Sequence, residues 1–333
     1  MTKKKKNVLL QDKKRHCHQM EKKLISYLLL IFATGCWGLS FFFTREIFNA
    51  SPAPSVTALV TLRLLVVSII TIPMLLLLRQ WEPLRKGDLK WFLLISLFEP
   101  FLYHLCETGA VSMVNASLVS VIVATVPLFV PFGVAAVYKQ KLQPMLLLGI
   151  IISIAGVVAM MAGDLSWQAN PMGIVILLGA VLASTAYMLI LVKIANNYRP
   201  ITITMYQNLF GLVYFIPCTL ITDAEAVSNL PLYSAKTWTL ILVLGIFCSL
   251  LAYTAYNHGF KQIGASKAAA FMNVSPVFTL AAVLLIGQEP FHWLKIIGMV
   301  IVIAGLFVAQ YEPRKRQQVT VSKSDPSPID LEK

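Results

Sequence analysis

Ten runs of mostly apolar residues, separated by short polar connectors, dominate this sequence. The hydrocarbon core of a bilayer is about 30 Å thick, and a helix needs roughly 20 apolar residues to cross it. The connectors hold clusters of proline, asparagine and charged residues, as turns do. The pattern predicts an all-α integral membrane protein with ten transmembrane helices. Their expected ranges are 24–44, 55–78, 91–111, 114–137, 145–162, 171–192, 201–222, 237–259, 266–287 and 291–310.

The composition supports this class and argues against others. Hydrophobic residues make up 57% of the 333 residues and charged residues only 13%, whereas soluble chains are roughly 25% charged. The net charge of +13 would fit a nucleic-acid-binding protein. However, the basic residues lie in tails and connectors, so we expect no nucleic-acid partner. The five cysteines form no CxxC motif, which argues against a disulfide framework or a metal site, and no cofactor is predicted.

The distribution of lysine and arginine predicts the orientation of the chain, because cytoplasmic connectors are enriched in both. A basic tail at 1–23 precedes an uncleaved first span, and a polar tail at 311–333 follows the last one. Both tails are expected to be disordered and cytoplasmic, in a multi-pass protein of the plasma or inner membrane. With alternating spans, the loop that holds Asp223 and Glu225 faces outward. The basic residues outside the cytoplasmic set are Arg45, Arg63, Lys236 and Lys295.

The two halves of the sequence resemble each other at an offset near 149 residues. "GIIISIAG" at 149–156 matches "GMVIVIAG" at 298–305, with five of eight positions identical. "NASLVSVIVATVP" at 115–127 and "GASKAAAFMNVSP" at 264–276 share alanine, serine and proline at the same steps. Because each half holds five spans, the second half must enter the membrane inverted. We therefore expect two inverted five-helix repeats, a plan that secondary transporters use.

Several motifs together make the chain similar to the drug/metabolite transporter superfamily, in its EamA-type permease branch. They are "CWGLSFFFTR" at 36–45, the step from Pro54 to Arg63, the two serine- and alanine-rich segments above, and "GQEP" at 287–290. The resemblance covers nearly the whole chain and implies repeats at 24–162 and 171–310. In the first half, Gln140 stands where the second connector has its acid. The family implies ten helices and export of amino acids or other metabolites, and it leaves the substrate open.

The third predicted span carries an unusual set of ionisable residues. Glu99, Tyr103 and Glu107 are spaced i, i+4 and i+8, which places them along one side of a helix, with His104 beside them. Arg63 in the second span lies at a depth comparable to that of Glu107. Ionisable residues inside spans usually face a bundle interior or a wet cavity. Two interpretations stay open: a structural ion pair of Arg63 with Glu107 or Glu99, or a substrate and proton site.

The second half offers neutral hydrogen-bonding and aromatic residues at the matching positions. Gln207 corresponds to Arg63, and Tyr253 and Tyr256 correspond to His104 and Glu107. For any single aromatic residue, simple packing is the alternative. The further candidates for a cavity wall are Trp37, Tyr187, Tyr206, Gln207, Tyr253, Tyr256 and Asn273.

These features favour a secondary transporter that moves a small metabolite by alternating access. Efflux is implied by the resemblance alone, and proton coupling through Glu99 or Glu107 is a hypothesis. An uncoupled facilitator and an uptake permease fit the same sequence. An intramembrane enzyme is the alternative from another class, but "HLCE" at 104–107 lacks a second histidine, and the sequence has neither GxSxG nor a P-loop. Monomer and homodimer both stay open.

Overall fold

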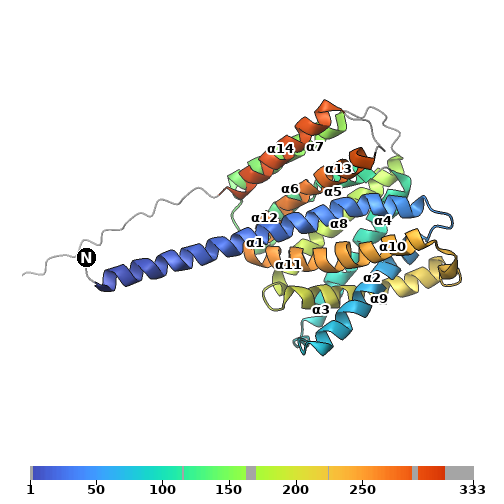
Figure 1. Cartoon of the computed structure of the whole chain (residues 1–333), viewed down its shortest axis with the longest axis horizontal. Helices are drawn as coiled ribbons and strands as arrows, with labels where there is room; N and C mark the ends of the chain where they lie inside the picture. Colours follow the sequence, from blue (N-terminus) through green and yellow to red (C-terminus); the bar gives the residue numbers. More distant parts are fainter. Residues whose placement is uncertain (1–2, 115, 163–169, 224, 287–291, 312–333) are drawn as a thin grey trace, which may run out of the picture.

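The computed structural model describes residues 3–114, 116–162, 170–223, 225–286 and 292–311, and these form helices without strands (Figure 1). Within them, nine helices are long and apolar enough to cross a membrane. The predicted fifth span corresponds to a shorter apolar helix, Pro144–Ala159. The predicted connectors at 163–169 and 287–290 and the tail at 312–333 lie outside the described residues. The structure is therefore that of an all-helical, multi-pass membrane protein.

The helices follow the predicted spans closely, and three spans are interrupted by π-helical or 3₁₀ segments. The elements are α1 (Lys3–Phe48), α2 (Val56–Leu77), α3 (Leu89–Ser96), η1 (Leu97–Leu102), α4 (Tyr103–Met113), α5 (Ala116–Val123), α6 (Val126–Tyr138), α7 (Pro144–Ala162), α8 (Pro171–Ile194), α9 (Pro200–Thr222), η2 (Leu230–Leu232), α10 (Ala235–Val243), η3 (Leu244–Leu251), α11 (Ala252–Ile263), α12 (Ala265–Ala270), η4 (Phe271–Val274), α13 (Ser275–Ile286) and α14 (Trp293–Gln310).

The N-terminal segment differs from the prediction. Residues 3–23 are not a disordered tail but continue the first span as one helix, α1, which projects beyond the bundle (Figure 1). The segment contains lysine, glutamine and leucine and neither proline nor glycine, and these residue types favour helix. A helix that is already nucleated inside the membrane can therefore extend through the basic segment.

Side-chain caps fix the start of several helices. The hydroxyl of Ser55 accepts a hydrogen bond from the Ala58 amide at 3.2 Å at the start of α2. Asn170 accepts one from the Met172 amide at 3.0 Å, directly before Pro171 opens α8. Such caps satisfy amides that the first helical turn leaves without a partner, and proline suits the first position because it has no amide hydrogen to satisfy.

Glycine residues bring α7 and α14 into close antiparallel contact. Gly149 faces Gly305. Gly156 lies about two turns further along the same face of α7 and meets Gly298. A Cβ atom at Gly156 would lie 2.7 Å from the Gly298 carbonyl oxygen, so the backbones approach more closely than larger residues allow. The Ser153 hydroxyl also donates to the Val302 carbonyl at 3.2 Å. Small residues serve this purpose in membrane helices generally.

The breaks within the spans lie at corresponding places in the two halves. The π-helical segment η1 interrupts the span from Leu89 to Met113, and η3 interrupts the span from Ala235 to Ile263. At Glu99 the backbone leaves the helical conformation altogether, with φ −147° and ψ 116°. The regular helical stripe predicted for Glu99, Tyr103 and Glu107 is therefore wrong in detail. Non-helical backbone at membrane depth is tolerated where it lies inside the protein or lines a cavity.

Candidate functional site

A small cavity of about 20 Å³ lies in the centre of the bundle, where α1, α2, η1, α4, α8, α11 and η4 meet. Seven predicted site residues line it: Trp37, Arg63, Glu99, Tyr103, His104, Glu107 and Tyr253. Tyr187, an aromatic candidate from the sequence, lines it as well, and the lining residues that sequence reasoning missed are Ser40, Phe41, Ser184, Met188 and Met272. A polar space of this size holds about one water molecule. The cavity therefore has room only for solvent-sized contents in this conformation.

Four ionisable side chains surround this cavity and are almost entirely buried. Glu99 and His104 are each 5% exposed, and Glu107 and Arg63 are each 2% exposed. Burying a charged group is costly unless hydrogen bonds or opposite charges compensate it. Their partners therefore decide what the cavity can do chemically.

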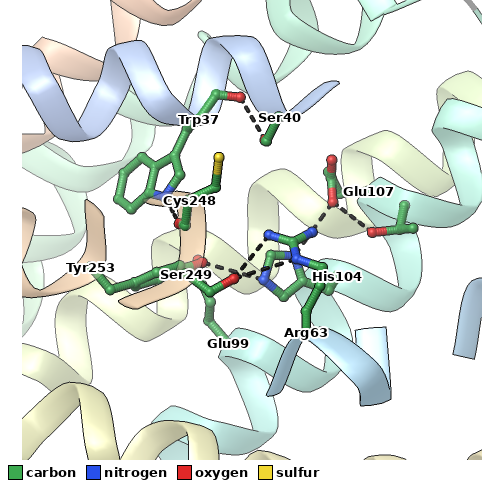
Figure 2. Close-up of polar contacts among 10 residues, drawn as sticks. Trp37, Ser40, Arg63, Glu99, His104, Glu107, Cys248, Ser249 and Tyr253 are labelled. Atoms are coloured by element: carbon green, nitrogen blue, oxygen red, sulfur yellow. Dashed lines mark hydrogen bonds and ion pairs between the residues drawn. The ribbon is translucent and has the colours of Figure 1, made fainter. Parts of the chain in front are cut away.

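A chain of hydrogen-bonding groups connects the two carboxyl groups (Figure 2). The Tyr253 hydroxyl donates to Glu99 Oε1 and lies 3.5 Å from His104 Nε2. On the other side of the imidazole ring, His104 Nδ1 lies 3.4 Å from Glu107 Oε2, which also accepts a hydrogen bond from the Thr108 hydroxyl at 2.9 Å. Every member of the chain from Glu99 to Glu107 can give or take a proton.

Arg63 does not form the ion pair that the sequence suggested. Its Nε and Nη2 atoms donate to the Ser249 hydroxyl at 3.4 and 3.2 Å (Figure 2). Among the described residues, no ion pair joins Arg63 to Glu99 or Glu107, although all three line the same cavity. The guanidinium thus reaches across to η3 in the second half, while Glu107 is held by residues of its own helix.

Gln207 lies behind the cavity and supports the broken backbone at Glu99. Its side-chain Nε2 donates to the Glu99 carbonyl at 2.9 Å, a group that the interruption of the helix leaves available. The Tyr187 hydroxyl lies 3.4 Å from Gln207 Oε1 and 3.3 Å from Asn257 Oδ1. The predicted site residue Gln207 is therefore buried beside the cavity and does not line it.

Two further predicted residues also lie outside the cavity lining. Tyr256 packs against the Trp37 ring at 4.9 Å, and its hydroxyl donates to the Met188 sulfur at 3.6 Å. Asn273 is fully buried in η4, and its side-chain amide has no hydrogen-bond partner among the described residues. Tyr256 therefore takes the packing role that was the alternative interpretation.

Trp37 joins the first helix to the break in η3. Its indole Nε1 donates to the Cys248 carbonyl at 3.0 Å, and its ring lies 5.0 Å from that of Tyr253. The Cys248 thiol in turn donates to the Cys36 carbonyl at 3.2 Å. Applying the repeat offset to Glu99 gives Cys248, and applying it to the neighbouring Pro100 gives Ser249, which sequence reasoning did not select. In the described part of the chain, no group of three or more histidine, cysteine or acidic residues is placed to hold a metal ion.

The fold and the cavity define a multi-pass membrane protein with a buried polar chamber between helices of both halves. The EamA-like transporter family matches residues 24–162 and 171–311, and the chain belongs to this family. The family model thus matches the chain twice, once in each half.

Relatives and solved structures agree with this assignment. The chain is 24% identical over 252 residues to the Uncharacterized transporter YetK of Bacillus subtilis (strain 168), covering 74% of this chain and 76% of that protein. It is 22% identical over 282 residues to an Uncharacterized transporter of Archaeoglobus fulgidus, covering 85% and 97%. A crystal structure with 17% sequence identity superposes with a TM-score of 0.68, covering 87% of this chain and 98% of the other. That likeness shows the shared fold.

Proposed function

We propose that this membrane transporter moves a small polar or amphipathic metabolite, such as an amino acid or a related compound, by alternating access, with a coupled proton. The observation that carries the proposal is the hydrogen-bonded chain from Glu99 through Tyr253 and His104 to Glu107 around a closed central cavity. The intramembrane enzyme considered from the sequence finds no support in the family match.

Contacts between the two matched segments support a closed conformation. At one end, the Thr61 and Thr219 hydroxyls lie 2.7 Å apart, and Thr57 and Thr222 lie 3.1 Å apart. At the other end, connectors of both segments meet around Tyr198, whose hydroxyl donates to Asp88 at 2.9 Å. A metabolite larger than a water molecule could enter only after one of these contacts opens.

Reciprocal packing supports the proposal of ten spans in two inverted repeats. α1 packs against α11, and correspondingly α8 packs against α4. α2 and α9 contact each other, as do α7 and α14. In both of these pairs, low residue numbers on one helix face high numbers on the other, as an inverted arrangement requires. Two similar halves can exchange conformations and so expose the site to alternate sides.

The chain of groups gives a route by which a proton could move between the two carboxyl groups. When Glu99 holds a proton, it can give that proton to the Tyr253 oxygen while the Tyr253 hydroxyl gives its own proton to His104 Nε2. The imidazole can then give the proton on its other nitrogen to Glu107. This path contains no substrate atom. A bound metabolite can therefore change the protonation of the path only by contacting one of the four residues that form it. Efflux driven by an inward proton gradient is the direction we propose, with both termini in the cytoplasm.

The experiment uses the purified full chain in proteoliposomes that contain a trapped pH-sensitive dye. A mixture of the twenty amino acids is added under an imposed pH gradient, and proton movement is followed with wild type, Glu99→Gln and the control Glu225→Gln. Glu225 lies in an outer connector and contacts no cavity residue. We expect proton movement with wild type and the control and at least a tenfold slower rate in Glu99→Gln. Equal proton movement in all three proteins would contradict coupling through Glu99.

A further inference from the structure

Arg63 brings to the central cavity a charged group that the proton path does not use. Of the described residues that line the cavity, Arg63 alone carries a permanent positive charge, and Glu99 and Glu107 are the acids. Its side chain comes from α2 in the first matched segment and is only 2% exposed. A charge buried to this extent needs compensation. The partners of the guanidinium therefore indicate what the cavity can bind.

The hydrogen bonds of Arg63 occupy one edge of its guanidinium and leave the charge without a carboxylate partner. Nε and Nη2 both donate to the Ser249 hydroxyl (Figure 2). Among the described residues, Arg63 makes no other hydrogen bond or ion pair. Each terminal nitrogen carries two hydrogen atoms, so the edge formed by Nη1 and Nη2 keeps two parallel N–H donors. This is the geometry that recognises a carboxylate with two hydrogen bonds.

The two acids of the cavity have donors of their own. The Tyr253 hydroxyl donates to Glu99, and the Thr108 hydroxyl donates to Glu107 at 2.9 Å. The cavity thus combines a guanidinium that has only a neutral partner with two carboxyl groups that are already hydrogen-bonded. A ligand group with a single negative charge fits this set. A doubly charged phosphate fits it less well, because the repulsion from both acids would act on twice the charge.

Packing between the two matched segments positions the guanidinium. η3 passes so close to α2 that a Cβ atom at Gly245 would lie 2.6 Å from a side-chain atom of α2, and this approach brings Ser249 within reach of Arg63. Thr61, two residues before Arg63, forms the 2.7 Å contact with Thr219 that joins the segments at one end of the bundle. Separation of the helices at this contact would enlarge the cavity and let a ligand group reach the guanidinium.

We propose that Arg63 binds the carboxylate of the transported metabolite, so that the substrates of this protein are small metabolites with one free carboxylate. The inference rests on the proposed function, because it assigns a group of the substrate to a residue of the same cavity. An arginine–carboxylate pair is strong and specific in direction. The aromatic side chains of Trp37 and Phe41, which line the same cavity, strengthen the pair by lowering the local dielectric constant.

The test measures binding to the purified full chain in detergent, separately from proton movement. Each of the twenty amino acids, and also acetate, lactate and benzoate, is titrated at matched ionic strength while the thermal unfolding midpoint is recorded. A ligand that binds the folded chain raises the midpoint in a saturable way. The acid with the largest rise is then compared with its amide, which keeps the shape of the carboxylate and lacks its negative charge. We expect half-saturation by the amide at a concentration at least tenfold higher.

Two variants and one matched control separate ligand binding from a structural role of Arg63. Arg63→Gln removes the charge, whereas Ser249→Ala removes the neutral acceptor and leaves the guanidinium in place. Arg45→Gln is the control, since Arg45 donates to the Val111 carbonyl at 2.9 Å and does not line the cavity. We expect half-saturation at a carboxylate concentration at least tenfold higher in Arg63→Gln, and nearly the wild-type value in Ser249→Ala and the control. The comparison of acid with amide uses wild type, so it stays decisive even if Arg63→Gln does not fold.

Two results would overturn the proposal. The first is a wild-type midpoint that responds equally to the acid and its amide, or to none of the carboxylates. The second is a half-saturating concentration that is unchanged in Arg63→Gln, or that Ser249→Ala raises as much, because Arg63 would then act only by joining α2 to η3. Either result together with proton movement in proteoliposomes would contradict this inference and leave the proposed function standing. Carboxylate binding that depends on Arg63, without proton movement, would contradict the coupling and support this inference.

Discussion

At the scale of single residues, Tyr253 is the link between the two carboxyl groups of the central cavity. Its hydroxyl contacts both Glu99 and His104, whereas the equally buried hydroxyl of Tyr256 contacts only the Met188 sulfur. We expect Tyr253→Phe to slow proton movement in the proteoliposome assay by at least tenfold, and Tyr256→Phe to keep the wild-type rate. Equal loss in both variants would indicate that packing, and not the proton path, had been disturbed.

Gln207 offers a second prediction at this scale. Gln207→Leu keeps the volume of the side chain but leaves the buried Glu99 carbonyl without its hydrogen bond. Leaving such a group unsatisfied costs about 1–3 kcal/mol, so the free energy of unfolding should fall by that amount in a detergent-based unfolding titration. The neighbouring variant Asn208→Leu is not a suitable control, because it would remove the hydrogen bond from the Asn208 side chain to the Thr204 carbonyl in the same helix. Thr239→Val, at an exposed surface position, should change the free energy by less than about 0.5 kcal/mol.

The residues of the site were predicted unevenly, for physical reasons. Glu99, His104, Glu107 and Arg63 could be found because ionisable groups in an apolar run need an internal environment. The partner of Arg63 could not, since depth along two helices does not tell which neighbouring helix a side chain faces. Ser249 contributes only a common polar group, and its role depends on the approach of helices distant in sequence.

At the scale of elements, span ranges were predictable because membrane thickness sets their length, whereas the breaks inside them were not. The predicted stripe of Glu99, Tyr103 and Glu107 assumed a regular helix, but η1 and the extended backbone at Glu99 interrupt it. These residues still line one cavity, because the break lies next to it. Sequence periodicity indicates which residues prefer the interior. It does not indicate where the helical hydrogen bonding is interrupted and a backbone carbonyl bonds to a neighbouring helix instead, as the Glu99 carbonyl does to Gln207.

The α7–α14 contact gives a prediction at the element scale. Gly156→Leu would force apart backbones that meet at the Gly298 carbonyl, and overpacking of this kind costs about 1–3 kcal/mol. Gly109→Leu is the matched control, since a Cβ atom at Gly109 has no neighbour within 4 Å. The thermal midpoint in detergent should fall in the first variant and stay nearly unchanged in the second. A midpoint equal to that of wild type in Gly156→Leu would show that this helix pair is not tightly joined.

A contact between two connectors gives a second prediction at the scale of elements. The Tyr198 hydroxyl donates to Asp88 at 2.9 Å and accepts from the Arg85 amide at 2.8 Å, and burial raises the pKa of Tyr198, so the hydroxyl stays protonated at physiological pH. Tyr198→Phe removes both hydrogen bonds, and each of them stabilises closure at this end by about 0.5–1.5 kcal/mol. Opening should therefore become at least about fivefold more frequent, measured as faster reaction of a thiol placed in the central cavity. An unchanged reaction rate would show that this contact does not hold the end closed.

At the scale of the whole molecule, side-chain contacts join the two matched segments at both ends of the bundle, and residues of both segments line the cavity between them. The family match identifies the chain as a membrane transporter, and a solved structure shares its fold. The packing of α1 with α11 and of α8 with α4 supports the two inverted halves that we propose. Such an arrangement predicts two further conformations, each open to one side. The internal repeat made this expectation available from sequence, while the closed state could only be found from the side-chain contacts at both ends.

The most direct measurement of alternating access uses Ser184→Cys in a chain whose five native cysteines are replaced by alanine. Ser184 lines the central cavity and is buried. A membrane-impermeant maleimide is applied to right-side-out and to inside-out vesicles, with and without a cross-link between cysteines introduced at Thr61 and Thr219. Alternating access predicts labelling from both sides, and loss of labelling from the Thr61–Thr219 side alone when the cross-link is present. Labelling in only one of the two vesicle orientations, with and without the cross-link, would contradict it.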